Sequence, residues 1–545
     1  MKATSKSAHV SNLGLVLCLL IMLASNSFAG SATWKSSPAS GDWNTATNWT
    51  PQTVPNGPFD VATFATSNTT AVSVSAQTEV NGITFNPRAS AFTITVDTKF
   101  HLIISGPGIT NNSGIMQNFV TAVDAEGLFG SIIFTNSATA GTLTTFTNKK
   151  PAVSGYSGGF LQFLGSSNAG DATYVNESGG ETAFHDAASA GNGMFFNAGG
   201  AANVDKAAVV LFATTNSSTL TPTAANGTFV NDGGTAAGAP GGETHFSGST
   251  PTAGNATLIA NGGTNGGEGG LIRFDGRSTG GTARVELFGN GKLDISPHGT
   301  SGVKVGSIEG DGTIILGSRH LTVGLNNLST TFAGLIEDGP GFSGGALTKT
   351  GDDVLVLTGA NTYTGGTTLK GSPSNKGNAT LEVDNTTGSG TGSGPVVVKG
   401  GALRGTGTIA GPVTIAGVHN GPSEDTFLAP GKFGKTAPAT LTIQNTLTLG
   451  PIATYEVSMT ATTATKVVAN GVTIDTSSAD IRFTHLFHGT LPPGTVFTII
   501  DNTSASSIVG TFLNLHDGWT FTQFGNTYKA NYQGGDGNDL TLTVQ

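Results

Sequence analysis

The stretch that decides the fold is LTKTGDDVLVLTGANTYTGGTTLKG, residues 347–371. Within it, VLVLTG at 354–359 predicts a short strand that ends at a glycine. ANTY and TGGT predict two corners, and TLKG at 368–371 predicts the next strand. The stretch therefore predicts one unit of a repeated β structure.

Two adjacent carboxylates, Asp352 and Asp353, are the first candidates for chemistry in this stretch. A pair of carboxylates can supply a general acid and a base. They follow Gly351 at a turn into a strand, however, and neighbouring strand residues point to opposite faces. We therefore expect a structural role for both, rather than a shared catalytic pocket.

Related segments recur along the chain with a variable period. FLGSSNAGDATYVNESGG at 163–180 and FHDAASAGNGMFFNAGG at 184–200 align, and similar segments begin at Phe134, Phe246 and Phe274. The aligned pairs are Phe163 and Phe184, Ala169 and Ala190, Gly170 and Gly191, Asn176 and Asn197, and Gly179 and Gly200. A period of about 20 to 35 residues, built from short strands, is typical of a stacked array.

Helical periodicity is not found in the sequence, so we expect an all-β fold: a right-handed parallel β-helix, or β-solenoid, with a possible small β cap at the C-terminus. The composition agrees, with 82 glycines in 545 residues and only 11% charged residues. Corners with positive φ recur in every coil and favour glycine. The formal charge of −10 argues against nucleic acid as a partner.

The N-terminus has the features of a signal peptide, residues 1–29. Two lysines precede an apolar run at 13–24 that is too short to span a bilayer, and small residues follow. The one cysteine, Cys18, lies in this run, so we expect a mature chain without disulfides. No later stretch approaches the length of a membrane-spanning segment.

Three parts are expected after the signal peptide. Residues 30–130 should form an N-terminal cap and the first coils, and residues 131–450 the β-helix repeats that include 347–371. Residues 451–545 should form C-terminal β coils or a cap; the sequence leaves open which of the two.

Ten positions of 347–371 fit a known pattern, L-x-K-x-G-x-x-x-L-x-L-x-G-x-N-x-Y-x-G-x-T. These positions are Leu347, Lys349, Gly351, Leu355, Leu357, Gly359, Asn361, Tyr363, Gly365 and Thr367. The stretch resembles the autotransporter-associated β-strand repeat. The resemblance implies a β-helical exported passenger and brings no catalytic residues with it.

Segments around the repeat are similar to other parts of such passengers. They are 304–339, 400–417, 428–431, 441–457 and 532–544. The chain departs from autotransporters at its end, where DLTLTVQ follows directly on the solenoid-like region. We therefore expect no C-terminal translocator barrel, and release or surface attachment by other means.

GGDGNDLTL at 534–542 nearly matches a calcium-binding nonapeptide. Calcium rolls need consecutive copies, because neighbouring turns share each ion. With a single copy, we favour a turn that feeds the last strand, Leu540–Val544. Calcium binding through Asp536 and Asp539 is the alternative.

Other motifs carry weak signals. GYSGG at 155–159 and GFSGG at 341–345 fit G-x-S-x-G, but a nucleophile elbow needs a following helix. The most metal-like clusters are His485 with His488 and His185 with Asp186, and no third or fourth ligand is evident for either. We expect these histidines to lie at corners or on the surface.

Glu181, Glu243 and Glu268 follow paired glycines. Equivalent positions in stacked coils can form a ladder of acids, as in the active grooves of β-helical polysaccharide lyases and hydrolases. Their spacing puts Glu181 and Glu243 in non-adjacent coils, however, and stacked like charges repel. A glycan-active groove built on these three acids is therefore the less favoured interpretation.

Three of the four tryptophans lie near the mature N-terminus: Trp34, Trp43 and Trp49. They can cover the open edge of the first coil or present an aromatic platform to sugars. We favour the cap, because the end of a solenoid has to be covered.

The sequence as a whole predicts a non-enzymatic structural or adhesive protein, secreted or on the cell surface of a Gram-negative type of bacterium. No catalytic, cofactor or metal residue is assigned. The expected partners are glycans or extracellular matrix, bound weakly and multivalently. The alternative is a carbohydrate-active β-helix enzyme, which should show three or more charged side chains converging within about 6 Å.

Overall fold

The computed structural model describes residues 30–214, 220–371, 379–417 and 426–545. The predicted signal peptide and Cys18 lie outside these residues. Within them strands and turns form the molecule, and the only helical segment is the 3-10 turn η1 (Ala46–Asn48). No helix in this part of the chain is long and apolar enough to cross a membrane.

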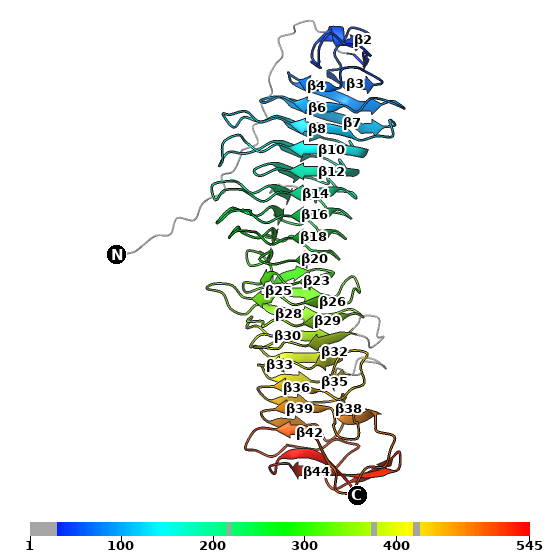
Figure 1. Cartoon of the computed structure of the whole chain (residues 1–545), viewed down its shortest axis with the longest axis vertical. Helices are drawn as coiled ribbons and strands as arrows, with labels where there is room; N and C mark the ends of the chain where they lie inside the picture. Colours follow the sequence, from blue (N-terminus) through cyan, green and yellow to red (C-terminus); the bar gives the residue numbers. More distant parts are fainter. Residues whose placement is uncertain (1–29, 215–219, 372–378, 418–425) are drawn as a thin grey trace, which may run out of the picture.

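The coils stack in sequence order along one long axis (Figure 1), from the blue N-terminal cap to the red C-terminal strands. Almost all strand pairs are parallel and join a coil to the next one. The predicted parallel β-solenoid is therefore confirmed. Its strands form four sheets, named here sheets I to IV.

Sheet I forms one side of the N-terminal coils. All its pairs are parallel except β1 with β2. In spatial order its strands are β2 (Trp49–Thr50), β1 (Ala32–Trp34), β3 (Gly57–Phe64), β5 (Thr78–Phe85), β7 (His101–Asn111), β9 (Ser131–Phe134), β11 (Phe160–Phe163), β13 (Glu181–Phe184), β15 (Val209–Ala213), β17 (Glu243–Ser247), β19 (Leu271–Phe274), β21 (Lys292–Asp294), β24 (Thr313–Ile315) and β27 (Leu335–Glu337).

Sheet II runs along most of the rod and carries the groove described below. Its strands are β4 (Ala71–Val74), β6 (Thr93–Val96), β8 (Gln117–Thr121), β10 (Thr142–Asn148), β12 (Asp171–Asn176), β14 (Met194–Asn197), β16 (Thr228–Asn231), β18 (Thr257–Ala260), β20 (Arg284–Leu287), β23 (Ser307–Gly310), β26 (Thr330–Phe332), β29 (Val354–Leu357), β31 (Thr380–Val383), β32 (Val396–Gly405), β35 (Thr426–Pro430), β38 (Ala453–Ser458) and β41 (Asp480–His485).

Sheets III and IV belong to the C-terminal half. Sheet III contains β22 (Gly302–Lys304), β25 (His320–Val323), β28 (Ala346–Lys349), β30 (Thr367–Lys370), the first part of β32, β34 (Val413–Ile415), β37 (Leu447–Leu449) and β40 (Val472–Ile474). Sheet IV contains β33 (Thr408–Ile409), β36 (Thr440–Ile443), β39 (Lys466–Ala469), β42 (Val496–Asn502), β45 (Asp539–Val544), β44 (Asn526–Gly534) and β43 (Thr520–Gln523). The strands from β42 onward pair antiparallel, so sheet IV ends in a small antiparallel cap.

Two columns of aromatic rings fill the core of the N-terminal coils. Adjacent rings of the first column stack with centroids 4.7–4.9 Å apart. Its members are Phe134, Phe163, Phe184, Phe212, Phe246 and Phe274. The second column, Phe119, Phe146, Tyr174, Phe195 and Phe229, meets the first edge to face at 5.6–5.9 Å. The recurring phenylalanines of the sequence are thus the stacked core.

A buried polar ladder runs beside these rings. Asn148, Asn176, Asn197 and Asn231 occupy matching positions in successive coils. Each Nδ2 donates to the next Oδ1 at 2.7–2.8 Å. Each side chain of the first three also donates to a backbone carbonyl in sheet I, which fixes the register between coils.

The stretch 347–371 forms one full coil, since Leu347 in β28 pairs with Thr367 in β30 of the next layer. The apolar pattern positions are buried within it. At Gly351 and Gly359 an added Cβ would lie 1.9 Å from a carbonyl oxygen of the preceding coil. Asn361 accepts the N–H of Ile336 and donates to the Gly390 carbonyl, so its amide joins three coils. The repeat pattern therefore encodes coil stacking.

Candidate functional site

The three N-terminal tryptophans are buried, with at most 1% of each residue exposed. The ring centroid of Trp49 lies 5.0 Å from those of Trp34 and Trp43, in edge-to-face contacts. All three rings pack against Phe64 of the first coils. Each indole N–H donates to a backbone carbonyl. This packing agrees with a role in covering the first coil, and burial leaves these rings no free face for a sugar.

Asp353 lies inside its coil. Its carboxylate pairs with Lys349 Nζ at 2.6 Å, and the two side chains are 3% and 0% exposed. Asp352 is half-buried, and its backbone N–H donates to Asn327 Oδ1. The structural role expected for this segment agrees with the position of Asp353.

The turn near the C-terminus uses Asp539 for backbone packing. Asp539 begins β45, and its carboxylate accepts the N–H of Asn502 at 2.9 Å. Asp536 is exposed in the preceding turn. Among the described residues, no group of three or more His, Cys, Asp or Glu is placed to hold a metal ion. The geometry favours the turn over the calcium alternative.

The predicted histidine clusters do not converge. The backbone of His485 in β41 pairs with that of Ser458 in the adjacent strand β38. His488, in contrast, stacks on Phe524 with ring centroids 3.8 Å apart. His185 Nδ1 contacts the Ala213 carbonyl, and burial lowers the pKa of this imidazole. Asp186 accepts the N–H of Gly165. The side chains of His185, Asp186 and His488 therefore have local structural partners.

The three glutamates that follow paired glycines do not form a ladder. Glu181 and Glu243 occupy one column of sheet I, but Val209 lies between them. Glu268 lies outside this column and pairs with Lys292 at 2.8 Å. Burial raises the pKa of Glu181. The spacing argument made from the sequence therefore holds.

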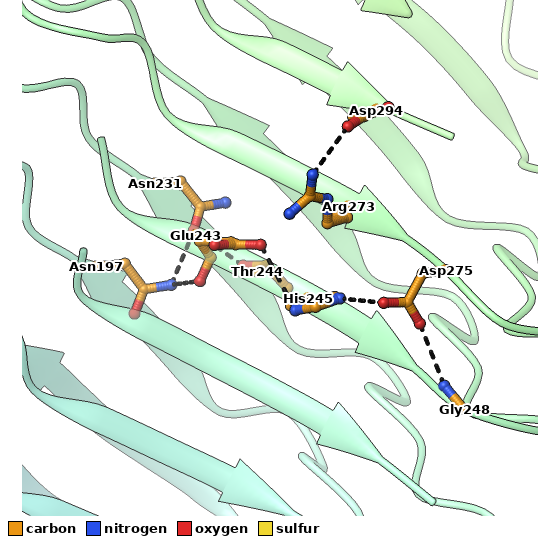
Figure 2. A network of polar contacts seen from close by, with 9 residues as sticks. All are labelled: Asn197, Asn231, Glu243, Thr244, His245, Gly248, Arg273, Asp275 and Asp294. Atoms are coloured by element: carbon orange, nitrogen blue, oxygen red, sulfur yellow. Dashed lines mark hydrogen bonds and ion pairs between the residues drawn. The ribbon is translucent and has the colours of Figure 1, made fainter. Parts of the chain in front are cut away.

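A polar network on the outer face of β17 was not predicted (Figure 2). His245 lies between two carboxylates, with Nε2 2.8 Å from Asp275 and Nδ1 3.6 Å from Glu243. Arg273 in the next coil pairs with Asp294 at 3.3 Å. On the inner side of the same strand, Thr244 donates to Asn231 of the buried ladder. The network thus ties three coils together on both sides of sheet I.

A large hollow lies on the outer face of sheet II. Its volume is about 780 Å³. We call it the acidic section, because its charged lining residues are Arg284, Glu286, Glu309 and Glu382. Phe288 and Phe433, 41% and 53% exposed, also line it. Charged groups beside exposed rings suit a polar ligand with flat apolar faces, such as a sugar.

Three charged side chains converge in the acidic section. Glu286 and Glu309 are register partners in adjacent coils. Arg284 Nε lies 3.3 Å from Glu286 and makes a shorter hydrogen bond to Glu309. Burial raises the pKa of Glu286 against the opposing effect of Arg284. This cluster meets the geometric condition stated above for a carbohydrate-active enzyme.

Glu382 and Asp384 form a second acidic pair. Burial and the neighbouring Asp384 raise the pKa of Glu382, whose carboxylate accepts the N–H of Phe433 at 2.6 Å. Asp384 is also partly buried, but Lys432 at 3.0 Å and hydrogen bonds from Thr406 keep its pKa below the ordinary value. The two carboxyls therefore differ in proton affinity.

A second hollow of about 370 Å³ follows along the same face. We call it the basic section, because Arg404, Lys435 and His485 line it together with a single acid, Glu456. Arg404 Nη2 pairs with Glu456 at 3.0 Å, and its guanidinium lies 6.0 Å from the Phe433 ring. The face of sheet II thus changes from acidic to basic along the rod.

Apart from His485, which was considered only as a metal ligand, none of the charged residues of these two sections was singled out from the sequence. Five of these charged residues share one feature, a position in a sheet II strand with the side chain lining a hollow: Glu286, Glu309, Glu382, Arg404 and Glu456. Charged residues are rare in this chain, so their recurrence at such positions was a usable signal. It required the strand register, which the sequence alone does not give.

Comparison with known protein families gives one match. The model of the passenger-associated-transport-repeat family matches residues 347–371, the coil described above. This coil is therefore a repeat of the type found in autotransporter passengers, which is consistent with an exported surface protein. No curated protein matches the chain.

Proposed function

We propose that the protein is an exported or surface-bound β-helical rod that binds glycans along the outer face of sheet II without cleaving them. The observation that carries this proposal is the acidic section, where Phe288 and Phe433 stand exposed beside carboxylates and threonines. Aromatic faces pack on the apolar faces of sugar rings, while charged and hydroxyl side chains bond sugar hydroxyls.

The passenger-type repeat supports export, because passengers of this kind function outside the cell. Fractionation of cells that express the full chain tests this part of the proposal. The protein should appear in the medium or on the surface, and a chain without residues 1–29 should stay inside the cell. Retention of the full chain inside the cell would contradict export.

Binding is tested with a glycan array and with immobilised polysaccharides of neutral, acidic and amine-bearing chemistry. Phe433→Ala should weaken binding to the best polysaccharide by about tenfold. Phe342→Ala is the matched control, since Phe342 is equally exposed, at 50%, and lines neither section. If both variants bind as the unchanged protein does, the sheet II face is not the binding site.

A carbohydrate-active enzyme is the second candidate, and the Arg284, Glu286 and Glu309 cluster favours it. Two carboxylates that contact one guanidinium are the kind of acid pair that glycosidases use. Glu286, whose pKa burial raises, would be the proton donor. Incubation with the same polysaccharides tests this candidate: new reducing ends that disappear in Glu286→Gln and Glu309→Gln would replace binding by cleavage.

A further inference from the structure

The acidic and basic sections are separated by a single short segment. This segment, residues 431–439, is called the strap here. Phe433 lines both hollows, and Lys435 and Ala437 line the basic section. The strap therefore forms the shared wall of the two hollows.

Beneath the strap the surface of sheet II is continuous. Glu382 lines the acidic section and Arg404 lines the basic section. These two residues are register partners in adjacent coils, and Arg404 pairs in turn with Ala429. No coil intervenes between the hollows, so one outward column of sheet II passes from one hollow into the other.

The strap is held by few contacts. At its base, Gly431 exchanges two backbone hydrogen bonds with Gly405, at 2.8 and 3.0 Å. At its tip, the Phe433 N–H donates to Glu382 and Lys432 pairs with Asp384 at 3.0 Å. The Phe433 ring also lies near the Arg404 guanidinium.

None of the strap's side chains is buried, and residues 432–437 are exposed. In the ion pair that holds the tip, Lys432 is 57% exposed and only Asp384 is covered. A segment without buried apolar side chains opens at low cost. Gly431 and Gly434 both have positive φ, at 119° and 71°, so glycines stand at the base and near the tip. The strap has the properties of a segment that can lift from the face as a unit.

We propose that the two hollows are one groove for a long linear polysaccharide, and that the strap lifts to admit the chain and then closes over it. The proposal rests on the proposed glycan binding and adds the length and direction of the ligand. From the coil of Glu286 to that of Glu456 the groove extends roughly 30–35 Å along the rod, at about 4.8 Å per coil. A disaccharide would fill one section only and would not need the strap to move.

The test compares a polysaccharide that the unchanged protein binds with the disaccharide derived from it. Lys432→Ala removes the ion pair to Asp384 and should raise the association rate of the polymer by about fivefold or more, because a strap that opens more often admits the chain faster. The association rate of the disaccharide should not change. Lys370→Ala, an exposed lysine on β30 outside the groove, is the matched control and should change neither rate.

Hydrogen exchange supplies a readout that does not depend on any glycan. The Phe433 amide should exchange faster in Lys432→Ala than in Lys370→Ala, and the polymer, but not the disaccharide, should slow its exchange. If polymer and disaccharide bind equally well, or if the polymer leaves the exchange of the strap unchanged, the strap proposal is wrong while glycan binding stands. If no polysaccharide or disaccharide binds, both the proposed function and this inference are wrong.

Discussion

Lys349 and Asp353 form an ion pair that is sealed inside the coil of the family repeat, with Nζ and Oδ1 2.6 Å apart and both side chains almost fully buried. Lys349 is one of the ten pattern residues, whereas Asp353 is not. Burial lowers the pKa of Lys349, and hydrogen bonding and charge interaction with Asp353 oppose this effect. The pattern lysine therefore depends on a partner that the pattern does not specify.

Replacement of Asp353 by Ala should destabilise the protein more than most single substitutions. It leaves the ammonium of Lys349 buried without its counter-charge, which costs about 3–5 kcal/mol. Urea denaturation, followed by circular dichroism, measures the loss. The double variant Lys349→Met with Asp353→Leu should lose less than Asp353→Ala, because it removes both charges and fills their volume. If the double variant loses more, the ion pair has a net stabilising role that this argument denies.

The sequence predicted the solenoid because the side chains that build it repeat visibly. Asn176 and Asn197 are separated by 21 positions and were matched directly. Asn148 and Asn231 belong to the same ladder but lie 28 and 34 positions from their neighbours, so they were missed. Phe212 of the aromatic column was missed for the same reason. Variable corner lengths hide the register even where the strands are regular.

The groove could not be predicted from the sequence, again because the corner lengths vary. Glu286 and Glu382 come from coils almost a hundred positions apart, and only the summed lengths of the intervening corners place them on one face. The strap lies still further along the chain and returns to Glu382. The tryptophan cap, in contrast, followed from a general requirement: the end of a solenoid has to be covered.

The asparagine ladder should be sensitive to a single deletion. Asn197→Ala removes hydrogen bonds to Asn176, Asn231 and the Glu243 carbonyl, and it leaves buried polar atoms unpaired. We expect a loss of about 3 kcal/mol in the free energy of unfolding. Asn192→Ala is the control, because Asn192 bonds Asp171 on the surface, and its loss should be about 0.5 kcal/mol or less. Equal losses in the two variants would contradict a stabilising role for the buried ladder.

The His245 network should contribute to the loss of folding stability at acidic pH. Burial alone would raise the pKa of Asp275. The hydrogen bond and charge of His245, together with hydrogen bonds from Ser247 and the Gly248 N–H, lower it by more, so the net shift is downward. A carboxyl with a lowered pKa in the folded state stabilises above its unfolded pKa, and this contribution is lost as the pH falls through the folded pKa. The loss should therefore occur below about pH 4.

Denaturation at a series of pH values checks this expectation. Asp275→Asn should flatten the decline in stability below pH 4, since the carboxyl that titrates is gone. Asp536→Asn, in an exposed turn at the far end of the rod, serves as the control and should keep the decline. If the free energy of unfolding of Asp275→Asn declined below pH 4 as it does in the unchanged protein, the network would not act through this carboxyl.

The N-terminal cap should protect the first coils from opening and from pairing with other molecules. Trp49 contacts both other cap tryptophans and Phe64, so Trp49→Ala opens a cavity at the end of the stack. A loss of about 3–5 kcal/mol in the free energy of unfolding is expected for such a buried ring. Because coils contact only their neighbours, the damage should concentrate at this end.

Hydrogen exchange should accelerate in β1, β3 and β5, and light scattering should detect association through the exposed edge. Trp519→Ala, at a residue 52% exposed in the C-terminal cap, should leave exchange in β1, β3 and β5 unchanged. Uniformly faster exchange along the rod in Trp49→Ala would contradict a local capping role.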